Sequence, residues 1–229
     1  MVEAVGESSD GGLLAPPDTD GSVRRLLWIN PVAVARHGRD ALEEAVWARG
    51  YRLVDSLSDQ RPVLIDKYRK AVAASTKPVA VMRCPLALRY VRSLHSVDWV
   101  TPNIYPLLIH SALELHAHHR PDGATTLTVT TPCVMLAELG NGLGLANTTF
   151  QDWDSFAAEQ HLSLTARRLD ASPVPPGLFD GLGVAVRQLT SRARIDAHFA
   201  APAADEPDLV EMFYCTDGCH NSHESYEAA

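Results

Sequence analysis

Short apolar runs alternate with amphipathic stretches along the first half of the chain. Runs at residues 26–29, 51–54 and 78–82 are apolar enough to predict three buried strands. A repeated order of strand and helix is typical of parallel β-α-β units, so the pattern predicts an α/β fold. The stretches with helical spacing that follow the three runs lie at residues 41–47, with Asp40 as the expected N-cap before the first, and at 60–74 and 86–94.

The second half of the chain continues this pattern less regularly. A helix is expected at residues 105–119, and a strand at 125–130, where Thr alternates with Leu and Val. A last apolar strand is expected at 209–214. Three weaker expectations are a glycine-rich connection at 140–147, a helix capped by Asp152 or Asp154 that runs toward residue 162, and a helix broken by glycines at 178–189.

The composition indicates a globular protein without the charge pattern of a nucleic-acid binder. Hydrophobic residues make up 46% and charged residues 21% of the chain, and the net charge is −8. Residues 1–22 hold acidic residues but no basic one and are rich in Gly, Ser and Asp, so this leader is expected to be disordered. No apolar run approaches the roughly 18 residues that span a membrane, and no secretory signal pattern is present. A cytoplasmic protein with neither nucleic-acid nor membrane partners is therefore expected.

The four cysteines stand where predicted strands end. Cys84 follows the strand at 78–82, Cys133 follows the strand at 125–130, and Cys215 follows the strand at 209–214. Cys219 completes a C-x3-C pair with Cys215, and Gly218 allows the loop between them to turn with a positive φ. In open parallel sheets ligands sit beyond the carboxyl ends of the strands, so these thiols are candidate ligands.

Four thiolates suit either a zinc ion or an iron–sulfur cubane. Structural zinc sites commonly use two close pairs of ligands, whereas Cys84 and Cys133 stand alone in the sequence. This spread favours a cluster held between two parts of the chain. The alternative is that some of these cysteines are buried apolar residues of the core.

The motifs around the cysteines resemble those of the catalytic-domain family of iron-only hydrogenases. The family's cluster cysteines lie in Cys-Cys-Pro or Ser-Cys-Pro, Pro-Cys-x-Ala-Lys-Lys and Cys-x-Gly-Gly-Cys elements. The corresponding elements here are Arg83-Cys84-Pro85, Thr131-Pro132-Cys133 and Cys215-Thr216-Asp217-Gly218-Cys219. The likeness covers about residues 24–221, and its weaker parts are segments 49–54, 147–156, 173–179 and 210–212.

The resemblance implies two α/β lobes, each with a mostly parallel sheet flanked by helices, at residues 23–122 and 123–221, with a tail at 222–229. It implies one [4Fe–4S] cluster in the cleft between the lobes, held by Cys84, Cys133, Cys215 and Cys219. The expected function is electron transfer, or redox support of a partner enzyme or redox partner protein. Two alternatives stay open: a cluster enzyme that reduces or transfers sulfur to a small substrate, and a structural protein whose four cysteines hold zinc.

Two departures from the family argue against hydrogen turnover. The family's proton-relaying thiol corresponds to Arg83, and the lysine that binds a cyanide of its diiron subsite corresponds to Leu136. Arginine keeps its proton at working pH, and leucine has no donor. Arg83 is expected either to favour the reduced cluster electrostatically or to form a plain salt bridge.

Overall fold

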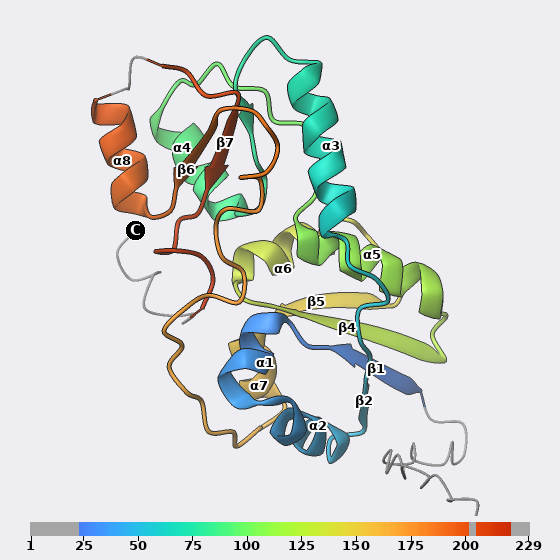
Figure 1. Ribbon diagram of the computed structural model, residues 1–229. Helices are drawn as coiled ribbons and strands as arrows, with labels where there is room; N and C mark the ends of the chain where they lie inside the picture. The colour runs from blue at the N-terminus through green and yellow to red at the C-terminus, as the bar shows by residue number, and fades with distance from the viewer. Residues whose placement is uncertain (1–22, 202–204, 221–229) are drawn as a thin grey trace, which may run out of the picture.

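The computed structural model describes residues 23–201 and 205–220, and its strands form two parallel sheets (Figure 1). The α/β class with parallel sheets flanked by helices is thereby confirmed. The leader at 1–22 and the tail at 222–229, both named above, lie outside the described residues.

The first sheet has four strands in the order β2-β1-β4-β5. All its pairs are parallel, and β1 at its centre pairs Leu26 with Arg52 on one side and with Leu127 on the other. The strands are β1 (Arg24–Trp28), β2 (Tyr51–Leu53), β4 (Thr125–Thr131) and β5 (Thr148–Asp152).

Helices cover both faces of this sheet, as the continuous apolar run of its central strand predicts. Leu26 and Trp28 face one core, and Leu27 and Ile29 face the other. In Figure 1 the first core lies under α5 (Leu107–His119) and α6 (Val134–Asn141), and the second lies against α1 (Pro31–His37), α2 (Arg39–Trp47) and α7 (Trp153–Glu159).

The second sheet has three strands in the parallel order β3-β7-β6. Its central strand is buried throughout, with Leu209 in the core that holds Leu64 and Tyr68, and Val210 and Met212 in the core on the opposite face. The elements are β3 (Val79–Ala80), β6 (Val186–Leu189) and β7 (Leu209–Met212), with α3 (Arg61–Ala73) on one face and α4 (Pro85–Leu94) and α8 (Arg192–Ala200) on the other.

The predicted boundary between residues 122 and 123 does not separate the two sheets. The four-stranded sheet combines β1 and β2 with β4 and β5, and the three-stranded sheet combines β3 with β6 and β7. Each sheet therefore takes strands from both halves of the chain.

Two local predictions are wrong. The expected helix at 178–189 is a series of turns followed by β6, because Gly177 and Gly183 adopt positive φ and the β-branched Val186 pairs with Leu209. The N-cap of α2 is Gly38 rather than Asp40. Asp40 lies in the first turn, where its negative charge interacts favourably with the helix dipole.

Candidate functional site

The predicted placement of cysteines at strand ends is confirmed. Cys84 follows β3 and is the N-cap of α4, and Cys133 follows β4 and is the N-cap of α6. Cys215 follows β7, and Cys219 closes the loop that begins there. Because β4 belongs to one sheet and β3 and β7 to the other, these positions draw cysteines from the ends of both sheets.

The four thiols lie close enough to interact electrostatically. Burial raises the pKa of Cys84 from its usual 9.0 to about 12, opposed by backbone N–H groups and supported by Cys133 and Cys215. Burial also raises the pKa of Cys219 well above its usual value, and Cys84, Cys133 and Cys215 add to that effect. The structure thus brings together all four cysteines that the sequence singled out.

The quartet is not arranged as the ligand shell of a single ion. Among residues 23–201 and 205–220, no three His, Cys, Asp or Glu side chains form a group that could hold one metal ion. Thiolates about 2.3 Å from a zinc ion would lie about 3.8 Å from one another in a tetrahedron.

The loop between Cys215 and Cys219 is fixed by Gly218 and its neighbours. Gly218 adopts the predicted positive φ, at 101°. A Cβ at Gly218 would lie 2.4 Å from the carbonyl oxygen of Val174 and 2.9 Å from Oγ of Ser172. Cys219 pairs with Val174 in an antiparallel bridge, and Ser172 Oγ donates to the Cys219 carbonyl at 2.7 Å. The absence of a side chain at Gly218 thus lets segment 172–174 lie against the loop.

Arg83 forms a buried ion pair with Glu211. The Arg83 side chain is 6% exposed and Glu211 is fully buried. The second carboxylate oxygen of Glu211 accepts from the N–H of Gly177 at 2.7 Å, and Arg83 also donates to the carbonyl of Pro175 at 3.0 Å. The Arg83 guanidinium lies over the ring of Phe213, 4.9 Å from its centroid. The salt-bridge alternative for Arg83 is confirmed, and the cation is held by two separate segments, residues 211–213 and the loop at Pro175.

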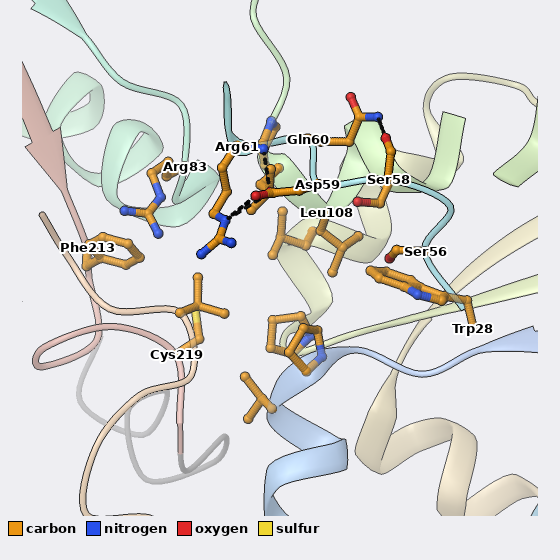
Figure 2. Close-up of a pocket in the computed structure, with 18 residues that line it drawn as sticks. Trp28, Ser56, Ser58, Asp59, Gln60, Arg61, Arg83, Leu108, Phe213 and Cys219 are labelled. Carbon is orange, nitrogen blue, oxygen red and sulfur yellow. Dashed lines mark hydrogen bonds and ion pairs between the residues drawn. The ribbon is translucent and has the colours of Figure 1, made fainter. Parts of the chain in front are cut away.

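A cavity of about 300 Å³ lies beside these groups (Figure 2). Cys219, Arg83 and Leu136 all contribute to its wall. The two positions at which the chain departs from the hydrogenase pattern thus line one cavity, next to one of the candidate cluster cysteines.

Sequence reasoning did not identify Glu211 or Arg61 as parts of this region. Glu211 is the one acidic residue of the apolar β7 segment, and a charge in a fully buried strand signals a buried partner. Arg61 lies at the start of α3 and carried no comparable signal, because arginines at exposed helix ends are common.

The raised pKa of Cys84 predicts a pH-dependent stability of the cluster-free, reduced protein. In the unfolded chain the thiol ionises near pH 9, whereas in the folded chain it stays neutral to about pH 12. Stability is therefore full below pH 9 and is lost as the pH rises, by about 1.4 kcal/mol at pH 10. Urea unfolding at pH 8 and pH 10 measures this loss. Cys84→Ser has no thiol to ionise at this position, so its free energy of unfolding should fall less between pH 8 and pH 10. An equal fall in the wild type and the variant would contradict the prediction.

Comparison with protein-family models finds none that matches this chain, and comparison with curated proteins finds no match either. Within the described part of the chain, no helix has the length and apolar character needed to cross a membrane.

Proposed function

We propose that this chain binds one [4Fe–4S] cluster through Cys84, Cys133, Cys215 and Cys219 and acts in electron transfer or redox support of a partner enzyme. The observation that carries the proposal is that the four thiols converge from three strand ends. Cys133 and Cys215 raise the pKa of Cys84, and all three of these thiols raise the pKa of Cys219. Four cysteine thiolates are the usual ligand set of a cubane.

The places from which the cysteines come support a cluster over a zinc ion. Structural zinc sites commonly use two close pairs of ligands. Here Cys84 and Cys133 come singly from the ends of β3 and β4, and only Cys215 and Cys219 form a close pair. The cleft between two lobes, which the resemblance implies, is on this proposal the space between the carboxyl ends of the two sheets.

Two features near the thiols oppose the rise in their pKa that burial causes. Cys84 and Cys133 are the N-caps of α4 and α6, where the helix dipole stabilises thiolates. Arg83 opposes the rise in the pKa of Cys219, but its ion pair with Glu211 balances most of its charge. The expected shift of a cluster potential by Arg83 is accordingly small. When bound, the cubane would supply a site for one electron.

The resemblance to iron-only hydrogenases is part of this proposal, without hydrogen turnover. Arg83 is committed to Glu211 and Pro175, and it cannot relay protons as the family's thiol does. Leu136 is an apolar, 5% exposed residue that offers no hydrogen bond to a cyanide. The chemistry that the family performs on its diiron subsite therefore lacks its supporting residues here.

Anaerobic reconstitution tests the proposal. The protein is expected to retain about four irons and four sulfides per chain and to show a paramagnetic signal on reduction, with no hydrogen evolution from reduced viologen. Single Cys→Ala changes at the four positions should each lower the iron content or alter the signal.

Thr216→Ala is the matched control, because Thr216 is an exposed residue between Cys215 and Cys219. It should load like the wild type. One stoichiometric zinc ion without sulfide would contradict the cluster and favour the alternative of a structural zinc site. Unchanged iron loading in all four cysteine variants would overturn the assignment of the ligands.

A further inference from the structure

The cavity beside Cys219 lies where an open parallel sheet usually binds its ligand. In the order β2-β1-β4-β5 the chain leaves β1 toward one side and β4 toward the other, so β1 and β4 flank the topological switch point. Trp28 ends β1, Pro31 and Val32 follow it, and Pro132 follows β4. All four line the cavity.

The second sheet directs its carboxyl ends at the same cavity. Arg83 follows β3 and Phe213 follows β7, and both residues line the cavity. From the first sheet, Ser56 after β2 lines it as well. A space at the carboxyl ends of five strands is formed by both sheets rather than by one surface loop.

The inner wall of the cavity is apolar and its mouth is charged. Trp28 and Leu136 are 6% and 5% exposed, and Leu108 stands beside Trp28 in the close-up (Figure 2). At the mouth, the Arg61 side chain is 62% exposed and the Asp59 side chain is 50% exposed. A ligand that fits both parts has an apolar body and a polar end.

Asp59 orients the Arg61 side chain but leaves the two terminal nitrogens of its guanidinium group open. Both carboxylate oxygens of Asp59 accept from Nε of Arg61, at 2.9 and 3.0 Å. No residue within 23–201 or 205–220 accepts a hydrogen bond from the two terminal guanidinium nitrogens of Arg61. In Figure 2 this end of Arg61 points toward the side of the cavity on which Arg83 and Cys219 lie. A guanidinium edge with two open nitrogens suits a bidentate carboxylate.

The backbone around the cavity also favours an anion. The helices α5 and α6 begin at this cavity, which Pro106 and Pro132 help to line. The N-caps of both lack a side-chain hydrogen bond to the helix, whereas the first N–H of α3 already donates to Asp59. Their N-termini carry partial positive charge that attracts anions.

We infer that this cavity binds a small organic carboxylate, with the carboxylate on Arg61 and the apolar body against Trp28, Leu108 and Leu136. The volume of about 300 Å³ is at the lower end of the range of small-molecule sites, so the ligand is the size of an aryl- or short alkyl-carboxylate. This inference goes beyond the proposed function, since Arg61 and the apolar wall are present whether or not the cysteines hold a cluster.

Binding of 3-phenylpropionate and of its neutral amide, measured by calorimetry and ligand-observed NMR, tests the site. The carboxylate should bind wild-type protein with a dissociation constant on the order of 1 mM, about tenfold tighter than the amide. Arg61→Gln should bring the carboxylate to the affinity of the amide. Leu108→Trp, which fills the apolar wall, should weaken both probes.

Arg69→Gln is the matched control, because Arg69 is an exposed arginine on the same helix whose 3.5 Å ion pair with Asp66 lies outside the cavity. It should bind both probes like the wild type. Equal affinity for the acid and the amide, or unchanged carboxylate binding in Arg61→Gln, would overturn the assignment, as would no carboxylate binding to folded wild type at about ten times the expected constant.

The same titrations on cluster-free and reconstituted protein separate this site from the proposed function. Carboxylate binding, together with the absence of iron from the protein after reconstitution, would support the cavity site and overturn the proposed cluster. Iron and sulfide at cubane stoichiometry, with no carboxylate binding to either form, would support the cluster and overturn the cavity site.

Discussion

Arg83→Met is expected to lower the free energy of unfolding by about 3–5 kcal/mol, because it leaves the carboxylate of Glu211 buried without its cation. Among the residues that the structure describes, Glu211 would then keep only the N–H of Gly177 as a donor. The carbonyl of Pro175 would also lose the N–H that Arg83 donates. Urea unfolding at pH 7 of the cluster-free protein measures the loss without any contribution from a bound group.

Arg39→Met provides the matched control. Arg39 forms a two-point ion pair with Asp55, but its side chain is 48% exposed and that of Asp55 is 69% exposed. Exposed pairs contribute at most about 1 kcal/mol. The double variant Arg83→Met with Glu211→Gln should recover part of the stability, because no buried charge then remains. A loss in Arg83→Met no larger than in Arg39→Met would contradict this account of the pair.

Gly218→Ala is expected to lower the free energy of unfolding by about 2–5 kcal/mol and to reduce iron loading. Its φ of 101° lies in the region that residues with a Cβ avoid, which contributes about 1–2 kcal/mol. The added Cβ would meet the carbonyl oxygen of Val174 at 2.4 Å, so segment 172–174 must move, which contributes about 1–3 kcal/mol more. That movement would pull on the bridge between Val174 and Cys219.

Gly144→Ala separates backbone strain from the steric clash. Gly144 also has a positive φ, 63°, but a Cβ there would meet nothing within 4 Å. It should cost about 1 kcal/mol and leave iron loading unchanged. Urea unfolding of the cluster-free protein and iron analysis of the reconstituted protein distinguish the two variants. Equal losses in both measurements would show that the contact with Val174 does not matter.

The strand and cysteine positions were predictable because their signals are local. The apolar runs at 26–29 and 51–54 bury residues on both faces of a parallel sheet, and they became β1 and β2. The positive φ of Gly218 followed from a glycine between two candidate ligands. These features depend on a few neighbouring residues, which a single sequence displays.

The region after Cys133 was not predictable, because its structure depends on distant contacts. The glycine-rich connection expected from residue 140 includes the end of α6, and β5 pairs with β4 beyond it. Gly140 lets α6 approach β5 closely, since a Cβ there would lie 2.3 Å from the ring of Phe150. The side chain of Asn141 makes two hydrogen bonds of 2.8 Å with the backbone of Phe150, as a neighbouring strand would. Helix propensity ranks Gly and Asn as unfavourable in helices, and it carries no information about a distant contact such as Phe150 on β5.

The pairing of strands into sheets was likewise set by long-range contacts. β4 returns to lie beside β1 after the chain has contributed β3 to the other sheet. Arg61 and Glu211 gained their roles from this arrangement, since Glu211 meets Arg83 across 128 positions of the chain. Only the folded chain shows that these residues face one another.

The four cysteines are divided between the two sheets, so a group bound by all of them would also connect the sheets. Cys133 is anchored to the four-stranded sheet, and Cys84 and Cys215 are anchored to the three-stranded sheet. Each sheet is hydrogen-bonded only within itself by the strand pairs of the described residues, so such a group would act as a cross-link between them. On the proposed function, oxidative loss of the cluster would remove the electron carrier and this cross-link in one event.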